Sequence, residues 1–159
     1  MCKINFKKTL PYIGSILFMI ILSYIYFSPD ILEGKVLFQG DTQQGIAIGQ
    51  EGKAFREATG ETTRWTNSLF SGMPNFQISP SYANNYWMGQ IGRIYHLGLQ
   101  SPASLVFIMM LGFFILLSAM KIRWYLALVG AIAYAFSSYF FIIIGAGHIW
   151  KFITLAYIP

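Results

Sequence analysis

Asp41 is the acidic residue of this sequence whose surroundings best suit a ligand site. It follows Gly40, and a glycine lets the backbone approach a bound molecule closely. A structural role is the alternative, because Asp41 stands where a helix is expected to begin, with Gln44 three residues later. That spacing resembles a capping box, in which two side chains satisfy free backbone N–H groups of the first turn. The two roles can coexist, so Asp41 is both a candidate site residue and a predicted helix cap.

A second group of charged side chains comes later in the same region. It consists of Arg56, Glu57, Glu61 and Arg64. Guanidinium groups match the geometry of phosphate oxygens, so this group could recognise an anionic headgroup. The alternative is a set of exposed charges on a helix and its exit, which contribute little individually. The sequence leaves both interpretations open.

His148 and Lys151 form the third candidate site, directly after an apolar run. An ionisable pair at the end of such a run is costly unless it serves a site or reaches the membrane interface. Lys151 could also extend its charge to lipid headgroups without any function. The sequence has no metal-ligand cluster, phosphate-binding glycine loop or nucleophile elbow. A soluble-type enzyme or a zinc site is therefore not expected.

Three apolar runs must position these residues. Residues 10–27 and 103–120 carry no charge, and each approaches the roughly 20 residues that an α-helix needs to cross a bilayer. Residues 124–144 form the third run. All six acidic residues lie between the first two runs, in one long loop. A loop that gathers every carboxylate beside one membrane face is where chemistry is expected.

The basic residues predict the orientation of these runs. Lys3, Lys7 and Lys8 precede the first run, while Lys121 and Arg123 follow the second. Short loops rich in Lys and Arg stay in the cytoplasm, so the N-terminus is predicted inside and the acidic loop outside. The third candidate site then emerges on the same outer face. The predicted segments are a cytoplasmic N-terminus (1–9), a first transmembrane helix (10–27), an extracytoplasmic loop with short helices (28–102), a second transmembrane helix (103–120), a cytoplasmic turn (121–123), a third transmembrane helix (124–147) and the start of a fourth (148–159).

Composition agrees with an all-α membrane protein. The chain is 55% hydrophobic with a mean hydropathy of +0.53, too apolar for an ordinary soluble domain of 159 residues. Its net charge of +5 does not predict a nucleic-acid partner, because about half of the basic residues flank the apolar runs. The first run lacks a small-x-small cleavage site, and the lone Cys2 predicts no disulfide. Three helices are too few to enclose a buried active site, so we expect the N-terminal piece of a larger polytopic protein.

Shorter patterns predict structure inside the loop. Residues 35–39 could form a short strand, and a helix is expected from about residue 40 to residue 58. Gly60 would end that helix, since glycine is common just past a helix C-terminus. Residues 82–100 carry aromatic and aliphatic side chains at roughly helical spacing. They predict an amphipathic helix at the membrane interface, where Trp and Tyr are favoured.

An ordered series of short motifs resembles the YfhO-like family of bacterial polytopic membrane proteins, especially its Bacteroidetes-type members. The series comprises Gln39-Gly40-Asp41 with Gln44, Arg56-Glu57-x-Thr59-Gly60-Glu61, the run Trp65-Thr66-Asn67-Ser68-Leu69-Phe70-Ser71-Gly72-Met73-Pro74, residues 130–141, Ala146-Gly147-His148-x-x-Lys151 and Ala156-Tyr157-x-Pro159. Each motif alone is weak, but their order along most of the chain is fairly specific. Proteins of that family are several times longer than this chain.

The YfhO-like family looks like the GT-C class of glycosyltransferases, which use polyprenyl-phosphate sugars outside the cytoplasm. That likeness implies an enzyme of the bacterial inner membrane, with a lipid-linked sugar and an envelope glycan or glycolipid as partners. Asp41 would be the general base, taking the proton from an acceptor hydroxyl. The residues aimed at the leaving phosphate would be Arg56, Arg64, His148 and Lys151, with Glu57 and Glu61 beside them.

The resemblance names no certain cofactor, although a divalent metal is compatible with it. The 159 residues alone are expected to lack activity. The competing hypothesis is a non-enzymatic membrane protein, either a transporter or flippase subunit or an assembly scaffold, in which Asp41 is only a cap. An enzyme would require Asp41, Arg56 and His148 to meet, whereas a scaffold would not.

Overall fold

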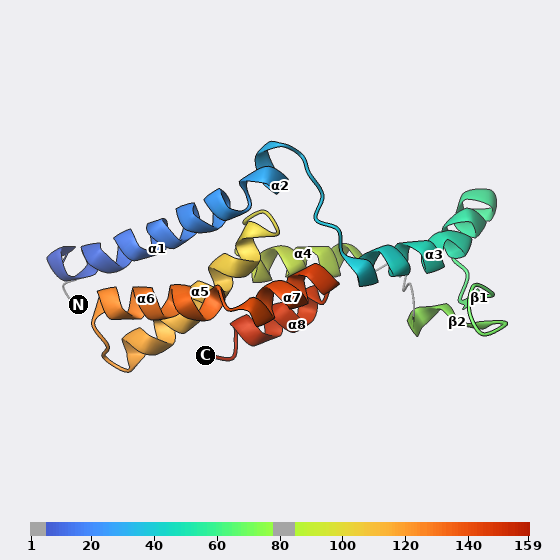
Figure 1. Cartoon of the computed structure of the whole chain (residues 1–159). Coiled ribbons are helices and arrows are strands. Elements are labelled where there is room, and N and C mark those ends of the chain that lie inside the picture. Colours follow the sequence, from blue (N-terminus) through green and yellow to red (C-terminus); the bar gives the residue numbers. More distant parts are fainter. Residues whose placement is uncertain (1–5, 78–84) are drawn as a thin grey trace.

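The chain is mostly helical, as the sequence predicts. The computed structural model describes residues 6–77 and 85–159. Helices make up 71% of the structure, in eight elements. The one sheet among the described residues is a two-residue antiparallel pair, β1 (Trp65–Thr66) with β2 (Met73–Pro74). Figure 1 shows a bundle at one end of the molecule and a protruding arm at the other.

The bundle is built around α5 (Ala103–Ala119). Its first two turns, residues 103–110, are buried, because α1 (Phe6–Tyr26), α6 (Trp124–Ala135) and α8 (Ile149–Ala156) all pack against α5. Alanines on one side of α6 and Gly112 of α5 permit this close packing. A Cβ at Gly112 would clash with the Ala156 carbonyl oxygen of α8. The N-terminal end of α1 and the turn between α5 and α6 lie at the same end of the bundle (Figure 1).

The structure does not show the three continuous transmembrane helices that the sequence predicts. Among the described residues, Thr9–Tyr26 is the one stretch of helix that is long and apolar enough to cross a membrane on its own. The apolar helix α5 is shorter, at 17 residues. In place of one helix over residues 124–147, the chain forms α6 and α7 (Ser138–Ala146), which meet at a bend of 46°. This pair reaches the required length and hydropathy only when taken together.

The break between α6 and α7 has a local and a tertiary cause. Ser137 takes an extended conformation as the N-cap of α7, and serine competes with a helical backbone more than an aliphatic residue does. The ring of Tyr26, at the end of α1, lies 5.3 Å from the ring of Phe136 and 5.1 Å from that of Phe141. This aromatic cluster joins both sides of the bend to α1.

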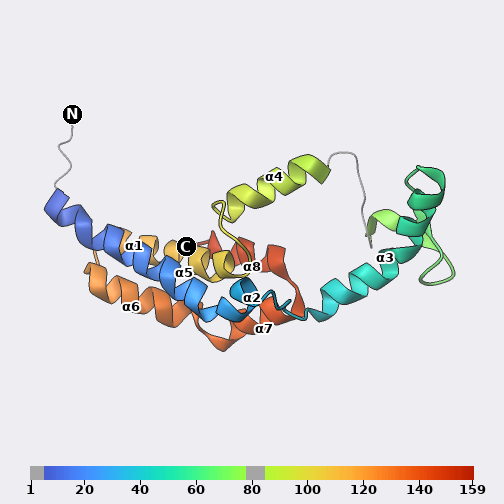
Figure 2. The same ribbon diagram turned by 90° about the horizontal axis from the view of Figure 1, so that it is seen from above.

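The loop between α1 and α5 forms the arm and an additional helix. After the short helix α2 (Ser28–Leu32), residues 34–39 run without regular structure, so the predicted strand over residues 35–39 is wrong. Helix α3 (Gly40–Thr59) confirms the predicted helix, and Gly60 ends it in a left-handed conformation with φ of 76°. Helix α3 extends away from the bundle and leads to β1, β2 and a 3₁₀ turn over Asn75–Gln77 (Figures 1 and 2). These elements together form the arm.

Helix α4 (Asn85–Tyr95) returns the chain to the bundle. It confirms a helix inside the predicted stretch 82–100, but residues 82–84 lie outside the described part of the chain. Trp87, Ile91 and Ile94 share one side of α4 and are exposed. Tyr95 instead contacts α8, where its carbonyl oxygen accepts a hydrogen bond of 2.8 Å from the Tyr157 hydroxyl.

Candidate functional site

The first turn of α3 meets the break between α7 and α8, and this contact brings two candidate residues together. The Oδ2 atom of Asp41 lies 3.3 Å from Nε2 of His148. Both side chains stay accessible, with exposed fractions of 55% for Asp41 and 52% for His148. A carboxylate next to an accessible imidazole can orient the ring and accept or pass on a proton.

Neighbouring contacts fix α3 against the end of α7. Nε2 of Gln39 donates a hydrogen bond of 2.8 Å to the carbonyl oxygen of Ile144. The Thr42 hydroxyl donates one of 3.1 Å to Oε1 of Gln39. Gly147 ends α7 with φ of 98°, and a Cβ there would lie 2.8 Å from Oγ1 of Thr42. The site therefore depends on close contact between the Gly147 backbone and α3.

The predicted capping role of Asp41 is wrong. Helix α3 begins at Gly40, so Gln39 is the N-cap and Asp41 lies within the first turn. No side chain caps this N-terminus by a hydrogen bond. The side chain of this N-cap residue is bound to Ile144 of α7 rather than to the first turn of α3. Asp41 keeps a favourable position, since negative charge near a helix N-terminus is stabilising.

Lys151 lies in the first turn of α8, close in sequence to His148. Its Nζ atom is 5.8 Å from the centre of the Tyr139 ring, a cation–π contact with α7. Lys151 is exposed, and no ion pair joins it to Asp41 among the described residues. The structure thus brings Lys151 near the site through α8, without a direct contact.

The other four candidate residues lie at the far end of α3. At about 1.5 Å of rise per residue, Arg56 is roughly 22 Å of helix length from Asp41. Glu57 pairs with Lys53 at 3.8 Å on the exposed helix surface. Glu61 and Arg64 are exposed in the segment that leads to β1. These four residues are therefore not brought together with Asp41 and His148.

Glu51 has the strongest polar network of the arm, and sequence analysis missed it. Its carboxylate accepts hydrogen bonds from the Thr66 hydroxyl at 2.5 Å, the Asn67 backbone N–H at 2.7 Å, the Ser68 hydroxyl at 2.9 Å and the Asn67 side-chain amide at 3.2 Å. The bonds from Thr66, Asn67 and Ser68 lower the pKa of Glu51 to about 2. Glu51 thereby holds the β1–β2 hairpin against α3. No local spacing could indicate this, because the partners lie 15 to 17 residues away.

We expect Glu51→Gln to release the hairpin. The amide has one acceptor oxygen in place of two charged ones, and hydrogen bonds to charged groups are the stronger kind. Trypsin cleavage after Arg64 should become about tenfold faster or more at neutral pH, because cleavage follows the population of the opened loop. Glu57→Gln is the matched control, since its exposed pair with Lys53 contributes little. Equal cleavage rates in the two variants would contradict the hairpin contact.

The same contact gives a pH dependence of known sign. A carboxylate whose pKa is lowered in the folded state stabilises it above the unfolded-state pKa and loses this effect as pH falls. The hairpin contact should therefore weaken as pH drops from about 4.5 toward 2. Fluorescence of Trp65 reports it in a chain whose other three tryptophans are replaced by phenylalanine. Glu51→Gln should remove this transition.

In the described residues, no group of three or more His, Cys, Asp or Glu side chains could hold a metal ion. Asp41 and His148 would supply two protein ligands to a divalent metal.

Comparisons with protein-family models, curated proteins and solved structures find no match to this chain. The candidate site therefore has to be interpreted from its own geometry.

Proposed function

We propose that this chain forms part of an integral membrane glycosyltransferase of the GT-C-like class, related to the YfhO-like family. It would move a sugar from a polyprenyl-phosphate donor to an envelope glycan or glycolipid acceptor outside the cytoplasm. The observation that carries this proposal is the approach of Asp41 to His148, from segments at opposite ends of the sequence. Two of the three residues that an enzyme was expected to bring together, Asp41 and His148, thus share one accessible place, whereas Arg56 lies at the far end of α3 and has no role in this proposal.

The surface of the bundle supports a membrane environment. Helix α1 exposes Leu10, Leu17 and Ile21 by 55% or more, and 17% of its apolar stretch is buried in the protein. Val129 of α6 and Ile142 of α7 are also exposed, by 64% and 68%. Water would make such a broad apolar surface unfavourable, whereas lipid chains would cover it. We therefore propose a multi-pass protein of the bacterial inner membrane with α1, α5 and the α6–α7 pair in the bilayer.

The chemistry follows from the two oxygens of the Asp41 carboxylate. Oδ2 faces Nε2 of His148, so the imidazole fixes the orientation of the carboxylate. Oδ1 is left to accept the proton of an acceptor hydroxyl as that oxygen attacks the anomeric carbon of the sugar. The sugar–phosphate bond breaks, and negative charge grows on the departing phosphate. Lys151, one helical turn beyond His148, is the nearest cation that this proposal assigns to that charge.

A transporter or flippase subunit, or an assembly scaffold, is the second candidate function. The separation of Arg56 and Arg64 from Asp41 along α3 favours it, because an enzyme that used all these cations would need them together. The arm also exposes Trp65 by 53% and Phe70 by 86%, as expected of a contact surface. In that case the Asp41–His148 contact would only attach the arm to the bundle.

The orientation of the arm tests the extracytoplasmic proposal. A cysteine at Gln50, in a variant without Cys2, should react with a membrane-impermeant thiol reagent in intact cells with a permeabilised outer membrane. Met120→Cys is the matched control in the α5–α6 turn, and it should react only after the inner membrane is lysed. Both residues are exposed in the folded chain. Labelling of the two positions in the reverse order would rule out an extracytoplasmic enzyme.

A further inference from the structure

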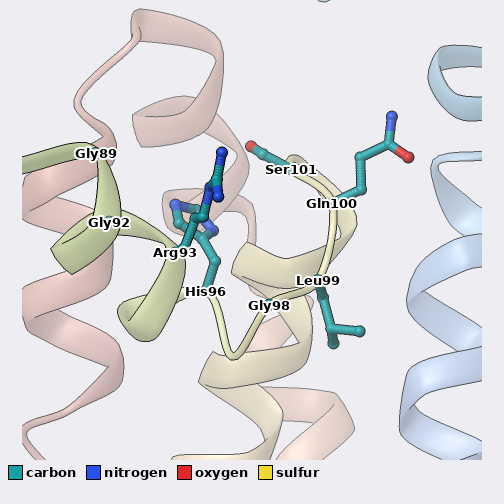
Figure 3. Close-up of a pocket in the computed structure, with 8 residues that line it drawn as sticks. All are labelled: Gly89, Gly92, Arg93, His96, Gly98, Leu99, Gln100 and Ser101. Atoms are coloured by element: carbon teal, nitrogen blue, oxygen red, sulfur yellow. The ribbon is translucent and has the colours of Figure 1, made fainter. Parts of the chain in front are cut away.

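A cavity of about 500 Å³ lies between the end of α4 and the start of α5 (Figure 3), and its lining includes neither Asp41 nor His148. Arg93 of α4 lines it together with three residues that follow the helix, His96, Gln100 and Ser101. Sequence analysis assigned none of these residues to a site. Figure 3 shows the side chains of Arg93 and Ser101 extending toward the same side of the cavity, whereas Gln100 points away.

Helix α4 has one side that lines this cavity and another side that is apolar. Gly89, Gly92, Arg93 and His96 recur at helical spacing and line the cavity. A Cβ at Gly89 or at Gly92 would meet nothing within 4 Å, so the glycines leave open space beside the two polar side chains. The exposed apolar residues of α4 lie at other helical positions. Under the membrane proposal, the helix rests at the interface at the level of lipid phosphates.

The charge of Arg93 has no acidic partner nearby. All six acidic residues of the chain lie between Asp30 and Glu61, so neither α4 nor α5 carries a carboxylate side chain. Arg93 is exposed, and within the described residues its guanidinium makes no ion pair or hydrogen bond. A guanidinium pairs well with planar or tetrahedral oxyanions, so Arg93 is open to an anion from outside the chain.

The ring of His96 can donate a hydrogen bond to such an anion from Nε2. Its Nδ1 lies 2.6 Å from Oγ of Ser104, which is fully buried. This is the one partner of the Ser104 hydroxyl in the described part of the chain, and in the tautomer where the hydroxyl donates to Nδ1 its buried hydrogen is satisfied. Burial lowers the pKa of His96, which favours the neutral ring. A neutral ring that accepts at Nδ1 carries its hydrogen on Nε2.

We infer that this cavity binds a phosphate group, with Arg93 as its charged partner and His96 Nε2–H and the Ser101 hydroxyl as further donors. The inference does not depend on the glycosyltransferase proposal, because it uses no residue of the Asp41 site. The phosphate could belong to a lipid headgroup or be free inorganic phosphate.

The two histidines of the chain allow a direct test, because ¹⁵N-histidine labelling gives imidazole signals from His96 and His148 alone. The chain is studied in dodecyl maltoside micelles, which contain no phosphate, at fixed pH and ionic strength. The probes are inorganic phosphate, dihexanoyl phosphatidic acid and the phosphate-free dihexanoylglycerol. A His148→Gln variant assigns the two sets of signals.

We expect at least one phosphate probe to shift the His96 signals in a saturable manner, and dihexanoylglycerol to leave them unchanged. A response to phosphatidic acid alone identifies a lipid headgroup site, and an equal response to inorganic phosphate identifies a free-phosphate site. Arg93→Gln should weaken binding by about tenfold or more, since it removes the charge-assisted bond. Lys53→Gln, which removes one positive charge from the exposed surface of α3, should leave the affinity unchanged.

Three results would overturn the inference. The first is the absence of any His96 shift with both phosphate probes. The second is a shift of His148 alone, which would put the phosphate at the Asp41 site. The third is wild-type affinity in Arg93→Gln while the His148 signals stay at their wild-type positions, which shows that the variant is folded.

Discussion

Asp41→Asn is expected to lower sugar transfer by roughly 100- to 10,000-fold, the usual effect of losing a general base. The measurement is incorporation of labelled sugar from a polyprenyl-phosphate donor by native membranes that hold equal amounts of the larger protein of which this chain is proposed to form part. The amide oxygen can still accept a hydrogen bond from His148, so the contact between α3 and the α7–α8 break is retained. What the variant loses is the negative charge and the ability to take a proton.

The same variant should fold almost normally. Asp41 is not the N-cap of α3, so its replacement removes only the interaction of its charge with the helix N-terminus and with His148. Exposed charges near a helix end contribute about 0.3 to 1 kcal/mol. Asp30→Asn in α2 is the matched control, with the same chemical change in the same loop and no assigned role. Near wild-type transfer by Asp41→Asn would favour the transporter or scaffold function.

Local signals in the sequence predicted most of the helices. The uncharged runs predicted α1 and α5, and Gly60 marked the end of α3. Each of these features depends on residues within a few positions of one another. The bend at Ser137 was not predicted, because the local preference of serine acts there together with the packing of the Tyr26 ring from α1, which no local signal indicates.

The site was predictable only in part for the same reason. Topology predicted that Asp41 and His148 share a membrane face, but the contact itself needs Gly147 to bring two distant segments together. The capping pattern at Asp41 was locally plausible, yet Gln39 is the N-cap, and its side chain bonds to the distant Ile144. Glu51 and its hairpin partners, like His96 and Ser104, interact through tertiary structure that no spacing rule describes.

Gly147→Ala is expected to separate α3 from the bundle. With φ of 98°, this position favours glycine, and placing an L-residue there costs about 1 to 3 kcal/mol. The new Cβ would also lie 2.8 Å from Oγ1 and 3.3 Å from the backbone nitrogen of Thr42. Because that nitrogen belongs to the helix backbone, rotation of a side chain cannot relieve the whole contact. Thermal unfolding in detergent should therefore occur at a lower temperature.

Gly145→Ala is the control, two residues earlier in α7. A Cβ there meets nothing within 4 Å, and alanine is more favourable than glycine inside a helix by roughly 0.5 to 1 kcal/mol. The same chemical change should thus stabilise the chain at Gly145 and destabilise it at Gly147. The ¹⁵N signals of His148 should move only in Gly147→Ala, since only that variant disturbs the approach of Asp41. If the two variants have the same His148 signals and the same unfolding temperature, Gly147 does not hold the site together. If His148 moves and transfer falls with it, the enzyme requires the contact between α3 and the α7–α8 break as well as the Asp41 carboxylate.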